Sequence, residues 1–136
     1  MTLKEGEIET PIDTVNVLIV DDQAPFRAAA RTVIKVSPGF DMTGEAESGE
    51  DAVAQAESLH PDLVLMDINL PGINGIEATR QITTSRPDTV VILMSTYRAE
   101  DLPADAMESG ASAYVHKEDF GPAVVRKIWD EHHSNS

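Results

Sequence analysis

The sequence predicts an α/β fold, a doubly wound sandwich in which a five-stranded parallel sheet lies between two layers of helices. Three features predict it: short apolar segments alternate with segments of helical periodicity, three of the apolar segments read as apolar on both faces, and polar residues follow several of them directly. The length of 136 residues suits one domain, which we place at residues 15–130.

The first half of the chain contains two strand and helix pairs. Residues 15–20 (VNVLIV) predict a strand. The helix that follows has five apolar residues on one face: Phe26, Ala29, Ala30, Val33 and Ile34. Residues 40–46 alternate between apolar and polar, which is typical of a half-exposed edge strand. Ser48 and Asp51 resemble a capping box, which begins a second helix that ends near Leu59.

The second half repeats this alternation. Residues 63–66 and 90–94 are uninterrupted apolar runs and predict two buried strands. A capped helix is expected between them, over residues 74–85. Residues 102–110 predict a weaker fourth helix, in which Pro103 is tolerated only in the first turn.

A short strand and a last helix complete the predicted domain. Residues 112–115 predict the fifth strand, and the final helix is marked by Val124, Val125, Ile128 and Trp129. Right-handed crossovers between parallel strands give a doubly wound sheet, for which we predict the flavodoxin-like strand order 2-1-3-4-5. We expect a disordered N-terminal arm at residues 1–14 and a disordered tail at 131–136.

Composition excludes several classes of function. The net charge of −14 argues against a domain that binds DNA, RNA or anionic lipid, because such domains present a basic face. The chain has no cysteine, which excludes disulfides, thiolate catalysis and cysteine-ligated metals. We find neither a signal peptide nor an apolar run long enough for a membrane helix, so the expected location is the cytoplasm.

Polar residues gather where the predicted strands end. Asp21 and Asp22 follow the first strand, Asp67 the third, Ser95 the fourth and Lys117 the fifth. The carboxyl ends of parallel strands meet at one edge of the sheet, where ligands bind in doubly wound folds. Topology alone therefore brings three carboxylates, a hydroxyl and an ammonium group together.

The chemistry of these side chains limits the functions that the cluster could have. Three adjacent carboxylates repel each other unless protons or a cation are present. Oxygen ligands without His or Cys suit Mg²⁺, which favours a phosphoryl partner, and a carboxylate can itself be a nucleophile. The acidic residues and Ser95 could instead have a local structural role. Asp21 or Asp22 could cap the helix that follows, Asp67 could be a turn residue, and Ser95 could be a helix cap. Lys117 has no such local role, since a cation is disfavoured before a helix.

These segments resemble the receiver domain of bacterial two-component response regulators. The resemblance spans about residues 15–129. It is carried by Leu18-Ile19-Val20-Asp21-Asp22, Leu65-Met66-Asp67-Ile68-Asn69-Leu70-Pro71-Gly72-Ile73-Asn74-Gly75, Met94-Ser95 and Tyr114-Val115-His116-Lys117. Residues 67–82 look most like the nitrate-type regulators, a subfamily that usually carries a helix-turn-helix output domain.

The resemblance implies a role for each site residue. Asp67 is the expected phosphoacceptor, which takes a phosphoryl group from phosphohistidine of a sensor histidine kinase or a phosphotransfer protein. The expected cofactor is Mg²⁺ (or Mn²⁺), bound by Asp67, by Asp22 directly, by Asp21 through water and by the backbone carbonyl of Asn69. Lys117 is expected to pair with a phosphoryl oxygen. Catalysis is limited to the domain's own phosphorylation and dephosphorylation.

The resemblance also implies a switch. Ser95 takes the position of the switch hydroxyl, and Tyr114 that of the switch aromatic. Phosphorylation is expected to shift the face formed by the helix at 102–110, the fifth strand and the final helix, and so to control binding of a downstream protein or of a second copy. The positions that tune the rates are Thr96, Asn69 and Tyr97.

Three residues depart from the usual family pattern. Glu118 follows Lys117 where the family usually has proline, so we expect a trans peptide bond or a shifted loop. Thr96 stands where Ala or Gly is usual, which predicts slower phosphotransfer or hydrolysis. Pro103 predicts that the fourth helix starts late, after a long loop.

Other functions stay open at this point. A pseudo-receiver would bind partners without phosphorylation, and the chain is either a stand-alone receiver or the receiver half of a longer DNA-binding regulator. A haloacid-dehalogenase-like phosphatase also uses a strand-end Asp with Mg²⁺. Asn69 disfavours that reading, because those enzymes carry an acid/base Asp at this position.

Overall fold

Five parallel strands form a single sheet in the order β2-β1-β3-β4-β5 in the computed structural model, which describes residues 14–133. The strands are β1 (Val15–Val20), β2 (Phe40–Ala46), β3 (Leu63–Asp67), β4 (Val90–Ser95) and β5 (Ala113–His116). The α-helices are α1 (Ala24–Lys35), α2 (Gly49–Leu59), α3 (Gly75–Ser85) and α4 (Pro122–His133). The predicted fold class and strand order are confirmed.

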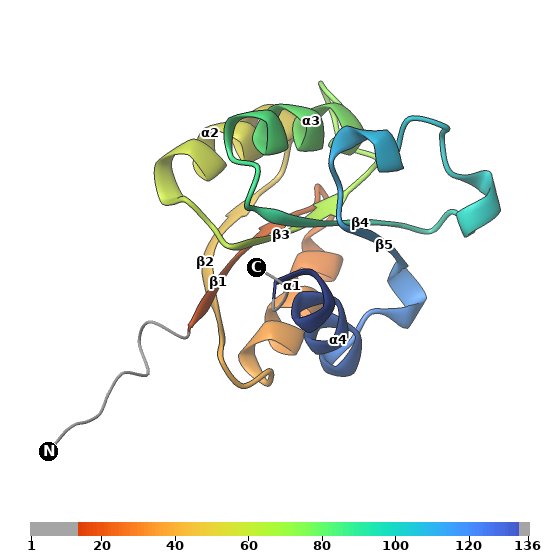
Figure 1. The fold of residues 1–136 in the computed structure, drawn as a ribbon. Coiled ribbons are helices and arrows are strands. Elements are labelled where there is room, and N and C mark those ends of the chain that lie inside the picture. Colours follow the sequence, from red (N-terminus) through yellow and green to blue (C-terminus); the bar gives the residue numbers. More distant parts are fainter. Residues whose placement is uncertain (1–13, 134–136) are drawn as a thin grey trace, which may run out of the picture.

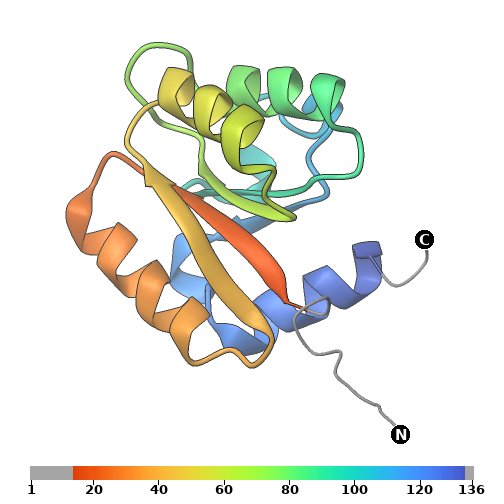
Figure 2. The same cartoon turned by 90° about the vertical axis from the view of Figure 1, so that its left-hand side faces the viewer.

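The sheet lies between two helical layers. Helices α2 and α3 cover one face, and α1 and α4 cover the other (Figures 1 and 2). Residues of β1 alternate between the two cores: Val17 and Ile19 pack on the α1 and α4 side, whereas Leu18 and Val20 pack on the α2 and α3 side. A central strand is thus buried on both faces, which explains the continuous apolar run at residues 17–20.

The helices that lead away from the sheet edge start where the sequence predicts. Ser48 caps α2 by accepting a hydrogen bond from the backbone N–H of Asp51, and Asn74 caps α3 in the same way with Glu77. The start of α3 lies directly against the end of β3. A Cβ atom on Gly75 would lie 2.0 Å from the carbonyl oxygen of Asp67, so only glycine fits this approach.

The predicted fourth helix at 102–110 is wrong. The segment between β4 and β5 forms only two short 3₁₀ turns, η2 (Ala99–Asp101) and η3 (Met107–Ser109). Proline disfavours a helical residue before it, and Leu102 accordingly has an extended backbone that ends η2. Gly110 then ends η3 in the left-handed region, with φ of 100°.

This irregular segment still packs on the domain. Ala106 is buried, and Leu102 packs against the same core as α2 and α3. The hydroxyl of Thr83 in α3 donates to the carbonyl of Ser109 at 2.9 Å. The expected long connection after β4 is therefore present, and it is anchored at η3.

The predicted ends of the domain differ slightly from those observed. Strand β5 begins and ends one residue later than residues 112–115. Helix α4 runs to His133, so it extends into the predicted tail at 131–136. The predicted arm at 1–14 and the end of the tail lie outside the described residues, apart from Thr14. Within residues 14–133, no helix has the length and apolar character needed to cross a bilayer.

Candidate functional site

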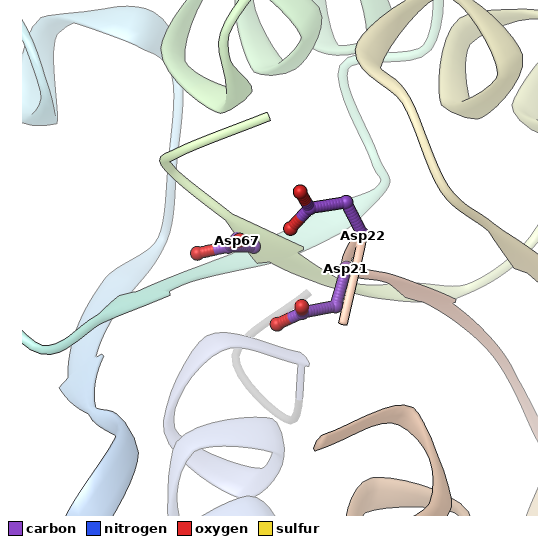
Figure 3. A group of neighbouring side chains, drawn as sticks. All are labelled: Asp21, Asp22 and Asp67. Atoms are coloured by element: carbon purple, nitrogen blue, oxygen red, sulfur yellow. The ribbon is translucent and has the colours of Figure 1, made fainter. Parts of the chain in front are cut away.

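Three carboxylates converge at the carboxyl ends of β1 and β3. One side-chain oxygen from each of Asp21, Asp22 and Asp67 lies within 4.8 Å of the others. Figure 3 shows that Asp21 and Asp22 are consecutive and that Asp67 lies beside them on the neighbouring strand. Asp21 is fully buried and Asp67 is 3% exposed, whereas Asp22 lies at the surface. The convergence predicted from strand order is confirmed for these three residues.

Lys117 supplies the positive charge of the site. It begins the 3₁₀ turn η4 (Lys117–Asp119), directly after β5. Its ammonium nitrogen lies 2.6 Å from Oδ2 of Asp21 and 3.5 Å from Oδ1 of Asp67. The same nitrogen lies 4.5 Å from the centre of the Phe26 ring, a cation–π distance. Lys117 is thus held between two acids and an aromatic face.

Asp21 is anchored on every side. Its Oδ1 accepts a hydrogen bond from the backbone N–H of Gln23, and its carbonyl oxygen accepts one from the guanidinium of Arg27, both at 2.8 Å. Its Oδ2 is buried and makes the ion pair with Lys117, and it has no hydrogen-bond partner among the described residues. Asp21 is therefore a firmly placed carboxylate with one oxygen facing the site.

The pKa of Asp67 is raised from 3.8 to about 6. Burial is the largest cause, because it disfavours the charged form, and repulsion from Asp21 adds to it. Lys117 and the backbone N–H of Asn69, which lies 3.4 Å from Oδ1, act in the opposite direction. Asp67 is thus ionised at neutral pH, and a cation beside it would favour that form.

The donor set fits a divalent cation. All three acidic side chains offer oxygen ligands, the preference of hard ions such as Mg²⁺. The exposed carboxylate of Asp22 is open to solvent, and the Oδ2 of Asp21 lacks a hydrogen bond. The cluster can therefore hold a divalent metal ion with some of its water retained.

Ser95 belongs to a second group of polar contacts. Its hydroxyl accepts a hydrogen bond from the backbone N–H of Tyr97 and lies within hydrogen-bond distance of the Tyr114 hydroxyl, both at 2.9 Å. The Tyr114 hydroxyl also donates to carbonyl oxygens at this strand end, those of Ser95 and Tyr97. The predicted switch pair is therefore in direct contact, and Tyr114 is turned inward against the end of β4.

The residues predicted to tune the rates of phosphotransfer and hydrolysis lie at the exposed edge of the site, which we call the rim. Tyr97 and Asn69 are exposed, and the Tyr97 hydroxyl donates to the side-chain oxygen of Asn69 at 3.4 Å. Thr96 is also exposed, and its carbonyl oxygen contacts the ring of His116. The Lys117–Glu118 peptide bond is trans, as expected for a residue other than proline.

Sequence reasoning missed three supporting residues. Phe26 was assigned only to the apolar face of α1, and Arg27 was not singled out, yet the two contact Lys117 and Asp21. Their position in the first turn of the helix that follows the Asp pair is the signal that could have identified them. His116 was noted only as part of the family motif, although its ring joins two loops of the site.

Comparison with known proteins agrees with this geometry. Residues 17–128 match the family described as the response regulator receiver domain. The chain is 42% identical over 114 residues to the response regulator UvrY of Escherichia coli strain K12, a match that covers 84% of this chain and 52% of UvrY. It is 34% identical over 114 residues to the transcriptional regulatory protein DegU of Brevibacillus brevis, covering 84% of this chain and 48% of DegU. The chain thus spans about half the length of these curated relatives.

Solved structures show the same fold. A two-component response regulator of the LuxR family from Aurantimonas superposes with a TM-score of 0.79 at 32% identity, covering 89% of this chain and 86% of that one. The response regulator domain of Thermotoga maritima CheB superposes with a TM-score of 0.75 at 32% identity, covering 85% and 93% of the two chains.

Proposed function

This chain belongs to the receiver domains of two-component response regulators, and from this premise we propose that Asp67 is its phosphoacceptor. A receiver domain is a signalling module. The observation that carries the assignment is the position of Asp67: a buried carboxylate at a strand end, between an acidic pair and Lys117. The donor in this proposal is phosphohistidine of a sensor kinase or of a phosphotransfer protein.

The proposed reaction is transfer of one phosphoryl group. An oxygen of ionised Asp67 attacks phosphorus, the phosphorus–nitrogen bond of phosphohistidine breaks, and the imidazole leaves with the bonding electrons and takes up a proton. Lys117 lies 3.5 Å from Asp67 and is placed to pair with an oxygen of the transferred group. Water later hydrolyses the acyl phosphate and restores Asp67.

Mg²⁺ (or Mn²⁺) is the cofactor in this proposal. Asp67 and the exposed Asp22 would hold the ion directly, Asp21 through water, and Asn69 through its backbone carbonyl. When bound, Mg²⁺ neutralises negative charge on the carboxylates and the phosphoryl oxygens. The fixed carboxylate of Asp21 supports an indirect role, because its Oδ2 already faces Lys117.

Ser95 and Tyr114 are the proposed switch. In the present arrangement the Ser95 hydroxyl is engaged by Tyr97 and Tyr114. A phosphoryl group on Asp67 offers new acceptors, so Ser95 moves toward it and Tyr114 fills the vacated space. The surface that changes consists of the η2–η3 segment, β5 and α4, since the segment after β4 has no α-helix. That surface would bind a downstream protein or a second copy of the chain.

The rim residues are proposed to set the rates. The hydrogen bond between Tyr97 and Asn69 links the loops after β4 and β3 beside the acidic cluster. Thr96 lies on the same loop and is exposed. We assign these three residues to control of phosphotransfer and of hydrolysis, and the cytoplasmic location stays a prediction.

A longer DNA-binding regulator is the second candidate context. It is favoured by the observation that the chain spans about half of its curated relatives, one of which is named a transcriptional regulatory protein. In that case the switch would act on an attached output domain. A pseudo-receiver remains the alternative in which Asp67 is never phosphorylated.

Intact mass after incubation with phosphoramidate tests the proposal. One Mg²⁺-dependent phosphoryl adduct is expected on the wild-type chain and on Asp88→Asn, which removes an exposed carboxylate elsewhere. Asp67→Asn should take up none. A folded wild-type chain without an adduct would support the pseudo-receiver, and an adduct that persists in Asp67→Asn would place the acceptor elsewhere.

A further inference from the structure

His116 joins the two loops that carry the switch hydroxyl and the site lysine. It is the last residue of β5 and pairs in register with Ser95, the last residue of β4. Its Nε2 lies 3.0 Å from the carbonyl oxygen of Thr96. Its Nδ1 accepts a hydrogen bond from the backbone N–H of Glu118 at 3.1 Å, which makes His116 the cap of η4.

These two contacts require one protonation state of the ring. A backbone N–H can only donate, so Nδ1 must be the unprotonated acceptor. A carbonyl oxygen can only accept, so Nε2 must carry the proton. The contacts are therefore satisfied together by the neutral Nε2–H form, and an imidazolium would keep the contact with Thr96 while losing the one with Glu118.

The bond to Glu118 lies directly beside Lys117. Lysine has a long, flexible side chain, so the place of its ammonium group depends on how firmly its backbone is held. Here that backbone is a 3₁₀ turn of three residues, η4, which has little hydrogen bonding of its own. Residue 118 is not an imino acid and carries an N–H, which His116 accepts.

We propose that His116 is a positioning residue, whose neutral ring sets the place of Lys117 and ties it to the loop after Ser95. The proposal rests on the proposed phosphorylation of Asp67. The ring would hold the turn that delivers the ammonium group to the two acids, and through Thr96 it would couple that turn to the switch loop.

Several elements of the site surround the ring. The cavity that His116 lines is also lined by Arg98 from the segment after β4, Tyr114 from β5, and Glu118 and Asp119 from η4. The ring therefore lies where the switch loop and the turn of Lys117 meet.

Three variants separate the two hydrogen bonds. His116→Asn places an amide oxygen near the position of Nδ1, so it keeps an acceptor for Glu118 but does not reach Thr96. His116→Gln places an amide near the position of Nε2 and keeps the Thr96 contact. His116→Phe keeps the ring and loses both hydrogen bonds.

The test is the rate of Mg²⁺-dependent phosphorylation by phosphoramidate, measured near pH 8 for the full chain. We expect His116→Phe to be about fivefold to tenfold slower than wild type, the effect of losing about one hydrogen bond. His116→Asn should recover most of the wild-type rate, and His116→Gln should not.

Two results would overturn the proposal. One is a wild-type rate in a folded His116→Phe variant, and the other is a rate of His116→Asn that is no higher than that of His116→Phe. A merely structural role would lower the melting temperature of the variants without a selective recovery of the rate in His116→Asn.

A measurement that does not depend on phosphorylation tests this inference separately from the proposed function. In ¹⁵N spectra of the wild-type chain near pH 8, the His116 ring should show a protonated Nε2 and a bare Nδ1. The ammonium signal of Lys117 should broaden in His116→Phe and stay sharp in His116→Asn. If the wild-type chain takes up no phosphoryl group, the proposed function fails, while these signals still decide the positioning role. A protonated Nδ1 near pH 8 would overturn it.

Discussion

The ammonium nitrogen of Lys117 lies 2.6 Å from Oδ2 of Asp21, which is fully buried. Asp67 is farther from the same nitrogen, at 3.5 Å. The lysine therefore compensates mainly the acid that we propose to be fixed, and the proposed phosphoacceptor receives less of its charge. The pKa of Asp67 is raised although a cation is close by, because burial and then repulsion from Asp21 outweigh the effect of Lys117.

The Asp67→Asn substitution is expected to stabilise the protein at neutral pH. The pKa of Asp67 is about 6 in the folded chain, above its ordinary value of 3.8. The folded state therefore binds this proton more tightly than the unfolded state, and stability is lost as the pH rises through about 6. Asn removes this cost, so the free energy of unfolding should rise by roughly 1–3 kcal/mol near pH 7.5.

Denaturant unfolding at several pH values checks this expectation. Below about pH 3 the carboxyl group is mostly neutral in both states, so the difference between Asp67→Asn and wild type should disappear. Asp88→Asn is the control, since this exposed residue lies outside the acidic cluster. A constant difference at all pH values would contradict the raised pKa.

Mg²⁺ is expected to stabilise the wild-type chain and to have little effect on Asp22→Asn. A ligand that binds only the folded state adds about 2.7 kcal/mol when its concentration is one hundred times its dissociation constant. Asp22 is exposed, so its substitution should leave the fold intact while removing one ligand. The measurement is the melting temperature as Mg²⁺ is added, with the exposed Asp41→Asn as control. Equal increases of the melting temperature in Asp22→Asn and wild type would show that Asp22 is not a ligand of the metal.

Thr96→Ala is expected to speed phosphorylation, hydrolysis of the phosphoryl group, or both. Threonine is larger than alanine beside the proposed acceptor, and the substitution leaves the carbonyl that contacts His116 in place. The measurements are the rate of adduct formation with phosphoramidate and the lifetime of the adduct. Thr43→Ala in β2 is the control, because this residue lies away from the strand ends at the site. Unchanged rates in Thr96→Ala would show that this side chain does not restrict the site.

Gly75→Ala is expected to damage the site through its backbone. The added Cβ would lie 2.0 Å from the carbonyl oxygen of Asp67, so α3 must move away from β3. We expect a loss of more than about 2 kcal/mol of unfolding free energy and slower phosphorylation. Gly121→Ala is the matched control, because a Cβ there meets nothing within 4 Å. Equal stabilities of the two variants would contradict the tight approach.

Local patterns in the chain were enough to predict the sheet and the meeting of its acids. The apolar runs at residues 17–20, 63–66 and 90–94 are continuous because those parts of β1, β3 and β4 are buried on both faces, and parallel topology then places Asp21 and Asp67 at one edge. The caps at Ser48 and Asn74 were readable because they act within four residues. The helix predicted at 102–110 does not form, because Pro103 favours an extended residue before it, and no local signal shows how the segment then packs.

The finer properties of the site depend on contacts between distant parts of the chain. The preference of Lys117 for Asp21, the raised pKa of Asp67 and the enclosure of the Ser95 hydroxyl by Tyr114 all join residues from different strands. The same holds for the ring of His116 between Thr96 and Glu118. Strand order brings such groups to one edge of the sheet. Their exact distances and their degree of burial then decide which groups pair and which carboxyl group has a raised pKa. Those quantities arise only when both cores are packed around the sheet.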